Sequence, residues 1–165
     1  MNINIDYYTN YEDEEHIEKY QKFIEKYIPK VKEMLENALK MKNILKKRNI
    51  YLGLGVVTRG EIKKLNAEFR NVDRETDVLS FPIFTKEEVD KLDEDNLLEE
   101  ISIGDIVLCL DVVEKQALEY GTGLEREMLY MICHGICHLL GSDHEIEEEK
   151  QQMRNMEEDI LSSIS

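Results

Sequence analysis

The stretch LEREMLYMICHGICHLLGSDHE, residues 124–145, holds three of the four histidines of the chain within a mostly apolar run. Acidic residues gather in its first turn, where negative charge suits the helix dipole. The run that follows is apolar on nearly every side and ends at Gly141, a residue type that commonly terminates helices. We therefore predict a buried helix from about residue 124 to residue 140, around which the rest of the fold packs.

The three histidines have the spacing of a metal site. His134 and His138 lie four residues apart, so a helix places them one turn apart on the same face. Gly141 permits a left-handed backbone and a chain reversal, which can return His144 to that face. Three neutral imidazoles leave one corner of a tetrahedron open, as in catalytic zinc sites. We predict that these histidines bind one Zn²⁺ ion per chain rather than serve as core residues.

The residue between the first two histidines excludes one familiar chemistry. The spacing H-x3-H-x2-G-x2-H matches the metzincin metalloproteases, in which a glutamate follows the first histidine and acts as the base. Gly135 occupies that position here and has no side chain. The pattern therefore indicates a metal that serves a different reaction. Cys133 and Cys137 lie about 100° around the helix from the neighbouring histidines and are interpreted as small core residues.

Working outward, apolar alternation predicts strands at 3–8, 49–58, 76–82 and 101–110. Helical periodicity covers residues 12–47, where Pro29 predicts either two helices or one kinked helix. Further helices are expected from Thr58, from Asp111 as the N-cap and over 147–164, whereas the acidic stretch 84–100 is interpreted as a loop. The pattern favours an α+β fold, a small mixed β-sheet with packed helices and a zincin-like metal helix.

Composition limits the class of protein. The chain has 165 residues, a formal net charge of −15 and three cysteines. It has no run of about eighteen apolar residues and no basic, apolar leader at the N-terminus, so we expect a cytoplasmic protein of one domain, 1–165. Residues 30–75 carry twelve basic against six acidic side chains, a charge of +6 that leaves −21 elsewhere. That segment either presents a basic surface or carries lysines for solubility.

Three blocks of sequence resemble one known family. HGICHLLGSDHE is similar to the H-G-x-x-H-L-x-G-x-D-H signature of the YbeY endoribonucleases, which are rRNA maturation factors. LNAEFRNVDRETDVLSFP, residues 65–82, and IGDIVLC, residues 103–109, resemble two further blocks of that family. The resemblance covers roughly residues 50–162. Ser142 departs from it by replacing an aromatic residue, and the helical region at about 12–47 and the acidic insertion at 86–100 match no signature.

The resemblance implies that zinc is held by His134, His138 and His144. It also implies cleavage of single-stranded RNA, with roles in small-subunit rRNA maturation and ribosome quality control. The expected partners are single-stranded RNA, an rRNA precursor and the small ribosomal subunit, and neither DNA nor a membrane is expected. Arg70 matches the functional arginine of the family.

Arg70 also suits this role chemically. A guanidinium fork can pair with two phosphate oxygens as charge develops in the transition state. Its alternative role is a surface ion pair with Glu68 or Asp73. Asp143 can either orient a ligand histidine or cap the chain reversal.

Two other functions compete with the endoribonuclease. One is a metallopeptidase-like hydrolase that uses another carboxylate, such as Glu145, as its base. The other is a non-catalytic, zinc-containing ribosome-binding factor. Gly135 argues against the first, and the absence of a fourth protein ligand in the histidine motif argues against the second, because structural zinc sites are normally closed.

Overall fold

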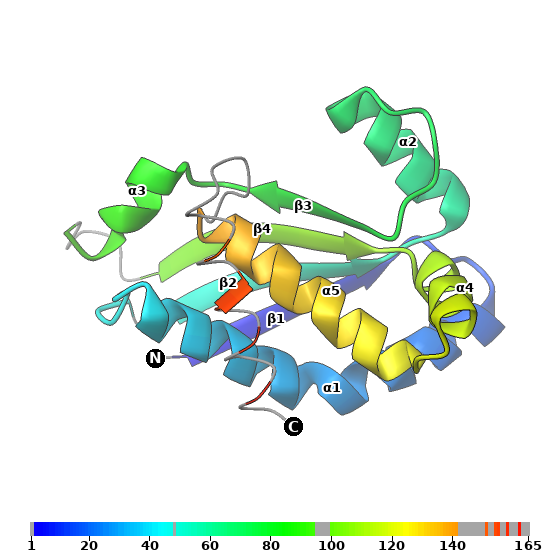
Figure 1. Cartoon of the computed structure of the whole chain (residues 1–165), viewed down its shortest axis with the longest axis horizontal. Coiled ribbons are helices and arrows are strands. Elements are labelled where there is room, and N and C mark those ends of the chain that lie inside the picture. The colour runs from blue at the N-terminus through cyan, green and yellow to red at the C-terminus, as the bar shows by residue number, and fades with distance from the viewer. Residues whose placement is uncertain are drawn as a thin grey trace.

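The core of the protein is a four-stranded mixed sheet with the strand order β1-β2-β4-β3 (Figure 1). The computed structural model describes residues 2–47, 49–94 and 100–141, together with 151, 154, 155, 158 and 162. Three strands run parallel, and the outer strand β3 runs antiparallel to β4. The strands are β1 (Asn2–Thr9), β2 (Asn49–Val56), β3 (Val78–Pro82) and β4 (Glu100–Leu108). The predicted α+β class with a small mixed sheet is confirmed.

The helices pack on both faces of this sheet. They are α1 (Glu14–Met41), α2 (Arg59–Arg70), α3 (Lys86–Asp90), α4 (Leu110–Tyr120) and α5 (Leu124–Leu139). The long helices α1 and α5 lie side by side across one face (Figure 1). On the other face α2 contributes Ile62 to a smaller cluster that includes Leu79 and Val107. No helix in the described ranges is both long and apolar enough to cross a membrane.

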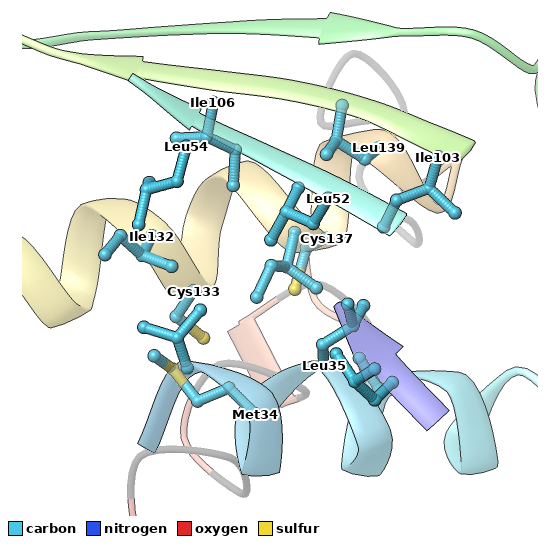
Figure 2. Close-up of a cluster of buried hydrophobic side chains, with 14 of the residues drawn as sticks. Met34, Leu35, Leu52, Leu54, Ile103, Ile106, Ile132, Cys133, Cys137 and Leu139 are labelled. Atoms are coloured by element: carbon cyan, nitrogen blue, oxygen red, sulfur yellow. The ribbon is translucent and has the colours of Figure 1, made fainter. Parts of the chain in front are cut away.

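The main core joins α5 to the sheet and to α1 (Figure 2). Alternate residues of β2, Leu52 and Leu54, point into it and are fully buried. Cys133 and Cys137 are also fully buried there, as the sequence predicted for small core residues. The third cysteine, Cys109, lies in the smaller cluster, and burial raises the pKa of its thiol. All three thiols therefore serve packing.

Helix α1 runs without interruption through Pro29. The alternative of two helices is therefore wrong. Pro29 is exposed, and one apolar stripe is buried on both sides of it. The buried residues of the stripe are Tyr20, Ile24, Tyr27, Val31, Met34, Leu35, Ala38 and Leu39. Packing of this stripe offsets the hydrogen bond that proline removes from a helix interior.

Two local predictions were wrong, one because a local capping box was overlooked and the other because of a contact between distant segments. The acidic stretch expected to be a loop contains α3, which Thr85 and Glu88 start with a reciprocal capping box. A single 3-10 turn, Leu92–Glu94, follows it. Asp111 does not cap α4, because Cys109 holds the N-cap position and Asp111 accepts a hydrogen bond from the Tyr20 hydroxyl. The predicted helix over 147–164 lies outside the described residues.

Candidate active site

A cavity of about 370 Å³ opens between α5, β3 and the last residue of α2. This volume lies within the usual range for small-ligand sites. Two kinds of group face it, histidines from α5 and polar or apolar groups from β3. The lining residues are Arg70, Val78, Leu79, Ser80, Pro82, His134 and His138. The cavity thus brings together three of the four residues that the sequence predicted for the site.

The two histidines converge on one point. Their Nε2 atoms lie 2.9 Å apart, and both side chains are half-buried. In a tetrahedral zinc site with Zn–N bonds of about 2.0–2.1 Å, two ligand nitrogens lie about 3.3 Å apart. A small rotation of either ring provides that spacing, so the pair fits a zinc ion. The third predicted ligand, His144, lies outside the described residues, so no complete group of three is seen within them.

Gly141 lies just beyond the C-terminal end of α5. The helix stops at Leu139, and the Gly141 N–H donates a 3.0 Å hydrogen bond to the His138 carbonyl. Gly141 has a φ of +86°, in the left-handed region that glycine adopts readily. A Cβ at this position would also lie 3.0 Å from the Lys86 Cα. The chain therefore leaves the helix axis at Gly141, as the sequence predicted, and its further course lies outside the described residues.

Gly135 lies where α5 closely approaches the sheet. A Cβ atom on this residue would lie 2.8 Å from the Ile106 Cδ1 and 3.1 Å from the Ser80 Oγ. Both the glycine and Ile106 are buried, so little space is available for either to move. A glutamate in the position of the metzincin base would meet Ile106 of β4 and Ser80 of β3 with its first side-chain atom. The missing base is thus a consequence of packing as well as of sequence.

Replacing Gly135 with glutamate should destabilise the fold rather than create a peptidase. The new side chain would be overpacked, and its carboxylate would be buried, so we expect a loss of several kcal/mol in the free energy of unfolding. Urea denaturation would measure it. Gly135→Ala is the control. Alanine has a helix propensity about 1 kcal/mol more favourable than glycine, and this gain opposes the cost of placing its methyl group against Ile106. A glutamate variant with wild-type stability would contradict the packing argument.

Arg70 reaches the cavity across the free edge of the sheet. It is the last residue of α2, which ends at Asn71 in a left-handed conformation. Its Nη2 donates a 2.7 Å hydrogen bond to the carbonyl oxygen of Ser80 on the outer strand β3. Among the described residues no carboxylate lies within ion-pair distance of Arg70, so the alternative pairing with Glu68 or Asp73 is not formed. The guanidinium is held beside the histidines by main-chain structure alone.

The basic segment 30–75 does not converge on the cavity. It extends along α1, the following loop, β2 and α2. Several of its charges are paired with acidic residues on the surface: Lys30 with Glu125, Lys40 with Glu36, and Arg59 with Glu75. Among the described basic residues only Arg70 lines the cavity. A local positive face near the site therefore depends on this one side chain.

Two residues of the site were missed by sequence reasoning. Ser80 lines the cavity from β3, and strand alternation in TDVLSFP could have placed it on the same face as Val78 and Pro82. Tyr130 lies one turn before His134 on α5, and the two ring centroids are 6.5 Å apart with an interplanar angle of 21°. The helical spacing of 130, 134 and 138 was the available signal.

The fold and the cavity define an α+β protein whose core helix presents paired histidines beside an edge-bound arginine. The family model described as endoribonuclease YbeY matches residues 9–165. The chain is 41% identical over 143 residues to endoribonuclease YbeY of Caldicellulosiruptor bescii, covering 86% of this chain and 89% of that protein. Its identity to endoribonuclease YbeY of Clostridioides difficile is 40% over 141 residues, with 86% and 88% covered.

A solved structure agrees with these relatives. The solution structure of a Thermotoga maritima protein superposes with a TM-score of 0.56 at 27% identity, covering 98% of this chain and 90% of that one. The chain belongs to the endoribonuclease YbeY family.

Proposed function

We propose that this protein is a zinc-dependent endoribonuclease that cleaves single-stranded RNA. The observation that carries the proposal is the convergence of His134 and His138, with Nε2 atoms 2.9 Å apart, in the same cavity as Arg70. Membership in the endoribonuclease YbeY family supports the same activity. Phosphodiester cleavage needs positive groups around a phosphate whose charge increases in the transition state. Arg70 would supply one, and a zinc ion held by the histidines would supply another.

Arg70 would bind the scissile phosphate. One guanidinium N–H is held by the Ser80 carbonyl, which anchors one side of the group. The remaining N–H donors keep a fork geometry that suits two phosphate oxygens. Because the anchor is a main-chain carbonyl in the sheet, little reorganisation is needed when substrate binds. A zinc ion held by His134, His138 and His144 would supply Lewis-acid stabilisation of charge on an oxygen of the substrate.

The biological setting follows from the family resemblance. We propose that the substrates are rRNA precursors and that the protein acts with the small ribosomal subunit in the cytoplasm, in rRNA maturation and ribosome quality control. A metallopeptidase-like role with its base at position 135 is disfavoured, because Gly135 packs closely against Ile106. The other predicted base, Glu145, lies outside the described residues. A ribosome-binding factor with structural zinc is disfavoured, because a cavity adjoins the histidines.

The test is a comparison of substrates with the zinc-loaded protein. We expect cleavage of a labelled single-stranded RNA, little cleavage of the same RNA in a duplex, and none of the matching DNA or of casein. Chelation should stop the reaction and zinc should restore it. Casein hydrolysis in place of RNA cleavage would reverse the proposal. Analysis of the RNA ends would identify the attacking group. A 2′,3′-cyclic phosphate indicates attack by the RNA 2′-hydroxyl, and a plain 3′-hydroxyl indicates attack by water.

A further inference from the structure

Ser80 lines the cavity between Arg70 and the histidine-bearing helix. It lies on β3 with its side chain toward α5, and its Oγ is 3.1 Å from the point where a Cβ of Gly135 would be. Gly135 directly follows His134 on the helix, so the hydroxyl lies over the histidine-bearing turn. The carbonyl of the same residue holds Arg70. One residue therefore links the arginine side of the cavity with the histidine side.

The Ser80 hydroxyl is not used by the fold in the part of the chain that the structure describes. Its carbonyl accepts from Arg70, but no described residue forms a hydrogen bond with its Oγ. The residue is half-buried and lines the cavity. A serine hydroxyl can rotate its hydrogen toward an acceptor, and partly buried polar groups are normally satisfied. A ligand rich in acceptors is the expected partner.

A phosphate group meets this requirement. It presents two nonbridging oxygens, and the guanidinium of Arg70 adjoins the cavity from the edge of β3. Hydrogen bonds from neutral donors to an anionic oxygen are shorter and stronger than those between neutral groups. A hydroxyl that faces α5 and a guanidinium at the strand edge approach such a group from different sides.

We propose that the Ser80 hydroxyl donates a hydrogen bond to a nonbridging oxygen of the scissile phosphate, and so acts as a substrate contact beside Arg70. This inference rests on the proposed endoribonuclease function. It assigns Ser80 two separate tasks: its main-chain carbonyl orients Arg70, and its side chain contacts the substrate. Only the second task depends on the identity of the side chain.

Ser80→Ala separates the two tasks, because the variant keeps the carbonyl that holds Arg70. We expect its kcat on single-stranded RNA to fall about tenfold to a hundredfold, because removing one hydrogen-bond donor to a developing anion has an effect of about this size or larger. Metal content and melting temperature should stay at wild-type values. Ser80→Thr keeps a hydroxyl and should recover most of the rate. Unchanged kcat in the alanine variant would overturn the inference, and loss of metal or of fold would instead assign Ser80 a structural role.

Phosphorothioate substrates locate the contact. Sulfur replaces one nonbridging oxygen at the scissile position and accepts hydrogen bonds weakly. With one of the two diastereomers, Ser80→Ala should cause little further loss, because the acceptor is already impaired. With the other, the two losses should multiply. If the two losses multiply with both diastereomers, the proposed Ser80 contact is overturned. RNA cleavage by the wild type would still support the proposed endoribonuclease function. Absence of RNA cleavage by the wild type would overturn both.

Discussion

Arg70→Ala is expected to lower RNA cleavage by about a hundredfold or more while the fold and the metal content stay intact. Removal of one preorganised donor to a developing oxyanion typically has an effect of this size. The fold should tolerate the change, because the Ser80 carbonyl lies at an exposed sheet edge where water can replace the lost donor. Single-turnover cleavage, metal analysis and urea denaturation of the same preparation would measure all three quantities.

Two matched variants make this result specific. Arg70→Lys keeps the charge but loses the planar fork, so it should recover only part of the rate. Arg74→Ala removes the same charge from the loop after α2, does not line the cavity, and should cleave RNA normally. Equal losses in Arg70→Ala and Arg74→Ala would mean that general electrostatic attraction, rather than a site contact, explains the effect. Near-normal turnover of Arg70→Ala with metal bound would remove Arg70 from the mechanism.

Alanine at His134, His138 or His144 is expected to remove most of the bound zinc, one ion per chain in the wild type. The Nε2 atoms of His134 and His138 lie 2.9 Å apart, so loss of either histidine leaves too few nitrogen ligands to hold zinc. Metal analysis after dialysis gives the stoichiometry. A second readout is thermal stability, because zinc at about a thousand times its Kd should add about 4 kcal/mol to the free energy of unfolding. The three variants should lose this stabilisation.

The fourth histidine supplies the control for the metal prediction. His16 lies at the start of α1, where its ring stacks on Tyr11 and its Nδ1 is 2.6 Å from an Asp13 oxygen. It lies outside the cavity, so His16→Ala should keep one zinc ion per chain. Wild-type metal content in His144→Ala would contradict the third ligand, and a loss of metal in His16→Ala would point to a different site.

Local periodicity explains which parts of this structure could be predicted. The spacing of His134 and His138 fixes their common face as soon as the segment is helical. Alternation along β2 and the apolar stripe of α1 identify the core for the same reason, because the chain itself sets the period. The left-handed backbone of Gly141 follows from the residue type. In each case the physical cause lies within a few residues of the effect.

Other features depend on contacts between distant segments. The bond from Arg70 to Ser80 arises only because β3 returns antiparallel to β4 at the sheet edge, which no local pattern reveals. Phe69 belongs to the apolar pattern of α2, which by periodicity alone would place it on the buried face. Its side chain is 58% exposed, because the helix packs on the sheet mainly through Ile62. The sequence therefore predicts well which helices and strands form. It predicts less well how these elements pack on one another.

The close approach of α5 to the sheet also has an evolutionary consequence. Two of the four glycine codons become glutamate codons through a single base change, so mutation alone can supply the side chain that a peptidase base would need at position 135. That variant meets Ile106 and Ser80 before it meets any substrate. A lineage would first have to accept smaller residues on β3 and β4, changes with no catalytic benefit of their own. The evolutionary route from this site to a peptidase site is therefore blocked by the order in which the substitutions must occur, although the change at position 135 itself alters a single codon.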